Sequence, residues 1–193
     1  MQLPKTIPKL IWFFINGAAF LCAQEKAIDV KRSTISIHVG KAGLFSVAGH
    51  EHWVEAPISS GVLNESAPPH VEFRVEAAKM QVKPDPKIDL KTQAEIQKDM
   101  QEKTLESARF PEILFRSSHV EKQTEGQWRV AGMLTLHGVT RPTSLSVKRS
   151  GNAYIGRTTL RQSDFGIKPI TAAGGTVRVK NELEIDFHIF QNL

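Results

Sequence analysis

Hydrophobic and polar residues alternate along most of this chain. The clearest example is HVEFRVEA (70–77), where Val71, Phe73 and Val75 are separated by polar side chains. A period of two residues is typical of half-buried antiparallel strands, because successive side chains point to opposite faces of a sheet. The same period marks STISIHV (33–39), EILFRSS (112–118), QWRVAGMLTL (127–136), TSLSVK (143–148) and VRVKNELEIDFHIF (177–190). Turn residues separate these segments at EGQ, HGVTRP, SGN and AAGG.

One segment, residues 87–112, departs from this alternation. Ile96, Met100 and Thr104 recur at a spacing of four among charged residues, which predicts a short amphipathic helix. Pro111 ends any helical continuation, because the residue before a proline is driven toward an extended conformation.

The pattern as a whole predicts an all-β protein with one short helical excursion. Seven or eight amphipathic strands must hide their edges, and closing an antiparallel sheet into a barrel removes those edges. A barrel of about eight strands leaves an interior that is either filled by side chains or open to one slender ligand. The pattern by itself allows an antiparallel barrel or a sandwich.

The N-terminus has a different character. Lys5 and Lys9 precede the apolar run IWFFINGAAFL, and a small residue, Ala23, follows. This order is typical of a secretory signal peptide, which predicts a leader at 1–23, a mature domain at 24–193 and a periplasmic or secreted location. A retained membrane anchor is the alternative, although the run is short for a spanning helix. Lipidation at Cys22 is disfavoured, because bulky Leu21 precedes the cysteine.

Charge and cysteine content narrow the function classes. The chain carries a net charge of +5, and Lys5 and Lys9 in the leader contribute two of these charges. The remaining charges alternate in sign without a basic stripe, so nucleic acid is not expected as a partner, whereas transient contact with an anionic membrane surface is compatible. Cleavage after Ala23 would leave no cysteine, which excludes disulfides, a thiol nucleophile and cysteine-ligated clusters.

Three local features suggest chemistry. His50 and His52 are two residues apart, so on a strand they would share a face and could hold a metal ion, or meet a polar lipid head group at a barrel mouth. His137 lies in LHGVTRP without the sequence context of a nucleophile, and we interpret it as part of a tight turn. Asp164 in SDFG lacks the other signatures of a kinase and fits a turn.

The phrases RFPEILFRSS, GMLTLHGVTRPTSLSV and RQSDFGIK, in this order, resemble the YceI family over roughly residues 28–190. The resemblance implies a lipocalin-like antiparallel barrel of eight strands, export to the periplasm, and a long apolar cavity for an isoprenoid, quinone-like or fatty lipid. It also implies no catalytic activity and no cofactor, and homodimers are compatible with it.

Under this reading, inward-facing apolar side chains form the ligand site. The predicted lining residues are Phe45, Val47, Phe73, Val75, Phe115, Trp128, Val130, Leu134, Leu136, Phe165 and Phe187. The alternative function is a metal- or redox-linked module that uses His50 and His52. No metal ligand or catalytic residue is predicted otherwise.

Overall fold

The computed structural model describes residues 25–42, 51–66, 68–172 and 177–192. Within them the protein is all-β with one short α-helix, as the alternation predicts. The strands are β1 (Lys26–Ala27), β2 (Thr34–Val39), β3 (Lys41–Ala42), β4 (His52–Glu55), β5 (Ile58–Asn64), β6 (His70–Glu76), β7 (Gln81–Val82), β8 (Glu112–Thr124), β9 (Gln127–Leu136), β10 (Val139–Ser150), β11 (Ala153–Arg161), β12 (Thr171–Ala172), β13 (Val177–Val179) and β14 (Glu182–Phe190).

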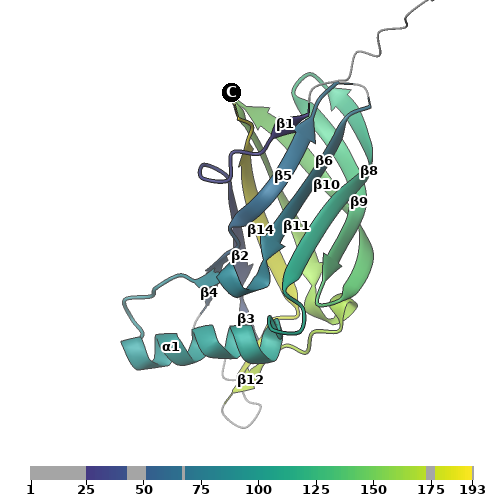
Figure 1. Ribbon diagram of the computed structural model, residues 1–193. Helices are drawn as coiled ribbons and strands as arrows, with labels where there is room; N and C mark the ends of the chain where they lie inside the picture. Colours follow the sequence, from purple (N-terminus) through teal and green to yellow (C-terminus); the bar gives the residue numbers. More distant parts are fainter. Residues whose placement is uncertain (1–24, 43–50, 67, 173–176, 193) are drawn as a thin grey trace, which may run out of the picture.

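A single antiparallel sheet dominates the fold. Its order is β1-β5-β6-β8-β9-β10-β11-β14-β2-β4-β7, which makes eleven strands in the described part of the chain. The predicted count of eight is therefore not confirmed. Three of the additional elements, β1, β4 and β7, have only two to four residues and extend the edges of the sheet. A small sheet of β12, β13 and β3 lies at the lower end (Figure 1).

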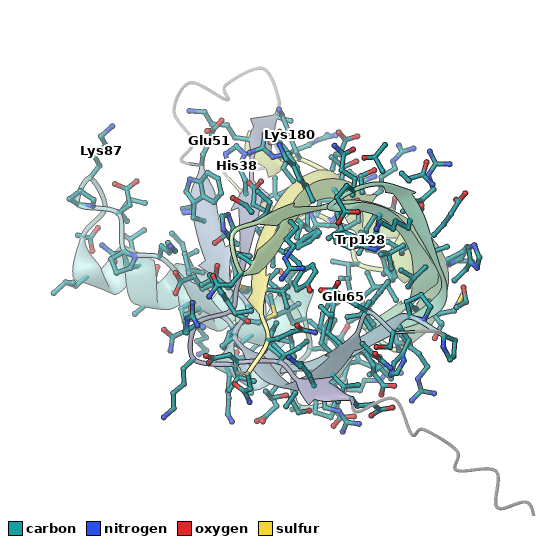
Figure 2. The ribbon with its side chains drawn as sticks, turned by 90° about the horizontal axis from the view of Figure 1, so that it is seen from above. His38, Glu51, Glu65, Lys87, Trp128 and Lys180 are labelled. Carbon is teal, nitrogen blue, oxygen red and sulfur yellow. The ribbon has the colours of Figure 1, made fainter. Side chains whose placement is uncertain are left out.

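The sheet is strongly curled, and backbone hydrogen bonds bring its distant strands together. β1 pairs with β5, and the residues that follow β1 reach the end of β14. The Asp29 N–H donates to the Phe190 carbonyl oxygen at 2.8 Å, and the Asn192 N–H donates to Ala27 at 2.9 Å. Seen from above, the strands consequently run round a ring (Figure 2).

Strand register explains why the apolar faces meet inside this ring. Trp128 of β9 lies opposite Val147 of β10, and Val130 lies opposite Leu145. Because side chains alternate, a register that aligns these pairs turns the apolar face of both strands to the same side. The predicted apolar faces of β9 and β10 thus coincide in the structure.

The turn between β9 and β10 consists of His137 and Gly138. Both have positive φ, 52° and 73°, which is the backbone of a type I′ turn. This turn connects strands that pair from Leu136 and Val139 onward. The sequence interpretation of LHGV as a tight turn is confirmed.

The helix α1 (Leu90–Asp99) crosses the lower end of the curled sheet (Figure 1). It begins at the N-cap Asp89, whose carboxylate accepts a hydrogen bond from the Thr92 N–H at 3.0 Å. A π-helical segment, η3 (Met100–Thr104), continues it, so the predicted helix is present over the expected residues. Of the helices described, none has the length and apolar character needed to cross a bilayer.

Two glutamine side chains fix the helix to the sheet. Gln97 accepts a hydrogen bond from the Val82 N–H at 2.8 Å and donates one to the Met80 carbonyl at 3.0 Å. Gln101 donates to the carbonyl oxygens of Met80 and of Ala77, at 2.9 and 3.1 Å. These amides satisfy backbone groups of the short edge strand β7 and of the 3-10 turn η2 (Ala77–Lys79).

Candidate functional site

The interior of the curled sheet contains an apolar cavity of about 210 Å³, which we call the upper cavity. Its wall is made by inward-facing side chains from β2, β5, β6, β8, β9, β10, β11 and β14. The apolar members include Ile35, Ile37, Leu63, Val71, Phe73, Val75, Ile113, Phe115, Val120, Trp128, Val130, Leu134, Leu136, Leu145, Val147, Leu160, Leu183, Ile185, Phe187 and Ile189. A lining that is mostly apolar suits a hydrocarbon chain, because few of its groups need a polar partner.

Most of the predicted ligand-binding residues lie on this wall. They are Phe73, Val75, Phe115, Trp128, Val130, Leu134, Leu136 and Phe187. Phe45 and Val47 fall outside the described residues. Whether the wall contacts a ligand stays a prediction.

Phe165 is placed differently from the prediction. It lies in the 3-10 turn η4 (Gln162–Phe165) rather than on a strand, and Gly166 ends this turn with a φ of 74°. The residue is 97% buried and belongs to the hydrophobic core, but it does not line the upper cavity. The alternation around SDFG is interrupted by the turn, so the ring does not follow the inward face of a strand. Asp164 belongs to the same turn, as expected.

Glycines on the inward face make room for aromatic rings. A Cβ atom on Gly156 would overlap the Phe187 ring and the Ser146 carbonyl oxygen. A Cβ on Gly132 would lie 2.7 Å from the Phe115 ring. In each case a phenylalanine from the neighbouring strand covers the glycine, which is a known way to stabilise a strongly curved sheet.

The upper end of the cavity is bounded by an aromatic pair and an ion pair. The rings of Trp128 and Tyr154 are tilted, with centroids 5.7 Å apart. Arg149 lies above the Tyr154 ring at 5.9 Å and forms an ion pair with Glu65 at 3.6 Å. Glu65 follows β5 and Arg149 belongs to β10, so their contact spans the ring of strands, and Figure 2 shows Trp128 and Glu65 inside that ring.

A second cavity, which we call the lower cavity, lies between α1 and the lower end of the sheet and measures about 540 Å³. The predicted helix face contributes Ile96, Met100 and Thr104 to its wall. Ionisable residues also line it, namely Lys41, His52, Glu95, Asp99 and Arg178. The two cavities adjoin, because Ile37, Met80, Thr104, Leu105, Gln162 and Leu183 line both.

The histidine hypotheses have separate outcomes. His52 lies on β4 and lines the lower cavity, whereas His50 falls outside the described residues, so the proposed pair is not tested. Within the residues that the structure describes, no group of three histidine, cysteine, aspartate or glutamate side chains is arranged to hold a metal ion. His137 lines neither cavity, and its Nε2 atom lies 3.0 Å from the Glu106 carboxylate.

The predicted lining residues include none from β2, β5, β10 or β11. The apolar faces of β2 and β10 are visible in the sequence, but those of β5 and β11 are not. Leu63 of β5 and both Tyr154 and Leu160 of β11 line the upper cavity, but neither strand shows a clear apolar alternation. The available signal was the SGN turn before β11, which implies that a strand follows it. Tyr154 is the single tyrosine of the chain, and it stands two residues after that turn.

Comparisons with known proteins agree with this architecture. The chain matches the model of the YceI-like domain over residues 27–190. A UPF0312 protein of Shewanella sp. (strain MR-4) is 34% identical over 74 residues, which cover 33% of this chain and 39% of that protein. The chain thus spans about two fifths of the length of the curated relatives it matches.

Two solved structures share the fold. Burkholderia cenocepacia BcnA is 15% identical, with a TM-score of 0.56, and the match covers 84% of this chain and 98% of BcnA. A polyisoprenoid binding domain from Saccharophagus degradans is also 15% identical, with a TM-score of 0.54 and coverage of 86% and 97%. At this identity the likeness concerns the fold alone.

Proposed function

Because this chain belongs to the YceI-like family, we propose that it binds a long-chain amphiphile, such as an isoprenoid or another lipid, in the upper cavity. The observation that carries this proposal is the apolar wall inside the curled sheet, to which eight strands contribute. The polyisoprenoid binding domain from Saccharophagus degradans, which shares the fold, supports the same ligand class.

Hydrocarbon burial supplies the affinity in this proposal. Each CH₂ group that leaves water for an apolar wall contributes about 0.8 kcal/mol. A chain of a dozen or more carbons therefore binds without an extensive set of polar contacts, and part of the gain offsets the ordering of the chain. This accounts for a specific binder whose wall consists mainly of leucine, valine, isoleucine and phenylalanine side chains.

We propose binding rather than catalysis. The histidine with the most suggestive sequence context, His137, is engaged with Glu106 at a turn and lines neither cavity. A general base must lie within hydrogen-bond reach of the proton it removes, so His137 is not placed to act on a molecule in the upper cavity. The function is sequestration of an apolar chain from water.

The N-terminal sequence supports a location outside the cytoplasm as part of this proposal. The basic and apolar segments of residues 1–23 have the order of a signal peptide. Cell fractionation with N-terminal sequencing of the recovered protein tests this point. A mature N-terminus at Gln24 supports export, and recovery of the uncut chain from the cytoplasm contradicts it.

Extraction of the purified protein with organic solvent, followed by mass spectrometry, tests the binding proposal. We expect a long-chain lipid to co-purify with the unmodified protein. Val147→Trp would place a large ring in the upper cavity and should abolish co-purification, whereas Ser146→Trp on the adjacent, exposed position of β10 should not.

Thermal unfolding of both variants shows whether each is folded. A folded Val147→Trp variant that retains the lipid, or an unmodified protein that yields none, would overturn the proposal.

A further inference from the structure

Tyr154, on the wall of the upper cavity, carries a buried hydroxyl group without a hydrogen-bond partner in the described part of the chain. The residue is 95% buried and lines the cavity, yet its hydroxyl has no hydrogen-bond partner among the residues that the structure describes. A buried hydroxyl without a partner is costly, and most buried polar groups in folded proteins are paired. Phenylalanine would fill the same space without this cost. The hydroxyl is therefore best explained by a hydrogen-bond partner that belongs to a bound molecule.

The surroundings restrict what that partner can be. Arg149, next to the Tyr154 ring, is already paired with Glu65, and Glu65 itself lines the upper end of the cavity. An anionic head group would approach the negative charge of Glu65 and would lose its hydration inside an apolar wall. An uncharged oxygen acceptor is not repelled by Glu65, and it loses less hydration free energy than an anion does.

We propose that Tyr154 is a specificity-determining residue that donates a hydrogen bond to an uncharged carbonyl oxygen at the polar end of the ligand. This inference rests on the proposed function and adds the orientation and the head-group class of the ligand. The polar end lies against the tilted pair of Trp128 and Tyr154, at the upper end of the cavity.

The hydrocarbon chain then extends downward. The lower cavity adjoins the upper one through shared wall residues such as Ile37, Met80 and Leu105. Beyond this junction the wall continues with apolar side chains, among them Val54, Val82 and Ile96. A chain longer than the upper cavity therefore finds apolar wall between the sheet and α1.

A matched set of probes tests the inference. Protein freed of lipid is loaded with the fluorescent probe N-phenyl-1-naphthylamine, which is then displaced by 2-heptadecanone, by heptadecane or by hexadecanoate. We expect the ketone to bind more tightly than the alkane. Tyr154→Phe should weaken the affinity for the ketone by roughly two- to tenfold, which is the range for one neutral hydrogen bond. The affinity for the alkane should stay unchanged.

Ser146→Ala is the control. Ser146 lies on β10, is exposed and does not line the upper cavity. Loss of its hydroxyl should leave the affinity for the ketone unchanged, because this side chain lies on the outer face of the sheet. The infrared carbonyl stretch of bound 2-heptadecanone should lie at lower frequency in the unmodified protein than in Tyr154→Phe, since a hydrogen bond weakens the C=O bond.

The outcomes separate this inference from the proposed function. If no probe binds the unmodified protein, the proposed function fails. If ketone and alkane bind equally, and Tyr154→Phe changes neither the affinity nor the carbonyl stretch, the role of Tyr154 is overturned while lipid binding stands. Tighter binding of hexadecanoate than of the ketone would overturn the uncharged head group.

Discussion

The imidazole of His137 and the carboxylate of Glu106 lie 3.0 Å apart, and both residues have left-handed backbone conformations. They are the two described non-glycine residues with positive φ, at 52° and 44°. Their contact joins the β9–β10 turn to the loop that follows η3. Phe110 completes the connection, because its ring lies 4.2 Å from that of His137.

This contact predicts coupling between the two residues in stability. His137→Ala and Glu106→Ala should each lower the free energy of unfolding, and the double variant should lose less than the sum. We expect a coupling of about 1 kcal/mol for one hydrogen bond at a half-buried site. Urea unfolding of the four proteins measures it. Strictly additive losses would show that the contact does not hold the turn to the loop.

Close packing between Gly156 and Phe187 gives a second prediction. Gly156→Ala should destabilise the fold by about 1–3 kcal/mol, the usual cost of overpacking, because the new methyl group overlaps the ring and a backbone oxygen. Gly40→Ala is the matched control, since its Cβ would meet only the flexible Lys180 side chain. Thermal or urea unfolding compares the two. Equal losses in both variants would contradict the role assigned to the Phe187 ring.

The contact between Gly156 and Phe187 explains why β11 is hard to predict from the sequence. β6, β8, β9, β10 and β14 each place at least two hydrophobic side chains at alternate inward positions, so their alternation is visible along the sequence. On β11 one inward position is Gly156, whose space Phe187 of β14 fills. The compensation lies on another strand, and the alternation of β11 itself is therefore weak.

The candidate site also has one part that the sequence predicts and one part that it does not. The hydrophobic wall follows from alternation, because strand register brings predicted faces such as those of Trp128 and Val147 together. The lower cavity depends on where α1 packs, and the amides of Gln97 and Gln101 fix that position through hydrogen bonds to distant backbone. Polar side chains on an amphipathic helix do not reveal such partners. Phe165 does not line the wall of the upper cavity, because its segment turns rather than extends.

Acid should weaken an ion pair on the outer face of the sheet. Arg116 donates two hydrogen bonds to the Glu72 carboxylate, at 2.8 and 3.0 Å, and these hold the pKa of Glu72 below its ordinary value. A carboxyl whose pKa is lowered by folding stabilises the folded state above the unfolded pKa, and this contribution disappears as the pH falls through the lowered pKa.

Glu72→Gln should therefore be slightly less stable than the unmodified protein at neutral pH. The difference should shrink as the pH falls below the ordinary glutamate pKa of about 4.5, and it should vanish once the pH is below the lowered pKa of Glu72. The effect is small because both side chains are partly exposed to solvent. Glu121→Gln on β8 is the control, since no ion pair in the described part of the chain involves Glu121. Urea unfolding between neutral and acidic pH measures this difference in the free energy of unfolding. A difference that grows in acid would contradict the prediction.

Tryptophan fluorescence should report occupation of the upper cavity. Trp128 lines its upper end, whereas Trp53 lies on β4 with 43% of its surface exposed and does not line it. Addition of 2-heptadecanone should change the emission of the unmodified protein and of Trp53→Phe, because the environment of the Trp128 ring changes when the cavity fills. Trp128→Phe should lose this response even where displacement of N-phenyl-1-naphthylamine shows that the ketone still binds. A response that follows Trp53 instead would place the ketone outside the curled sheet, since that ring is stacked on His38 with centroids 4.8 Å apart, away from the apolar wall.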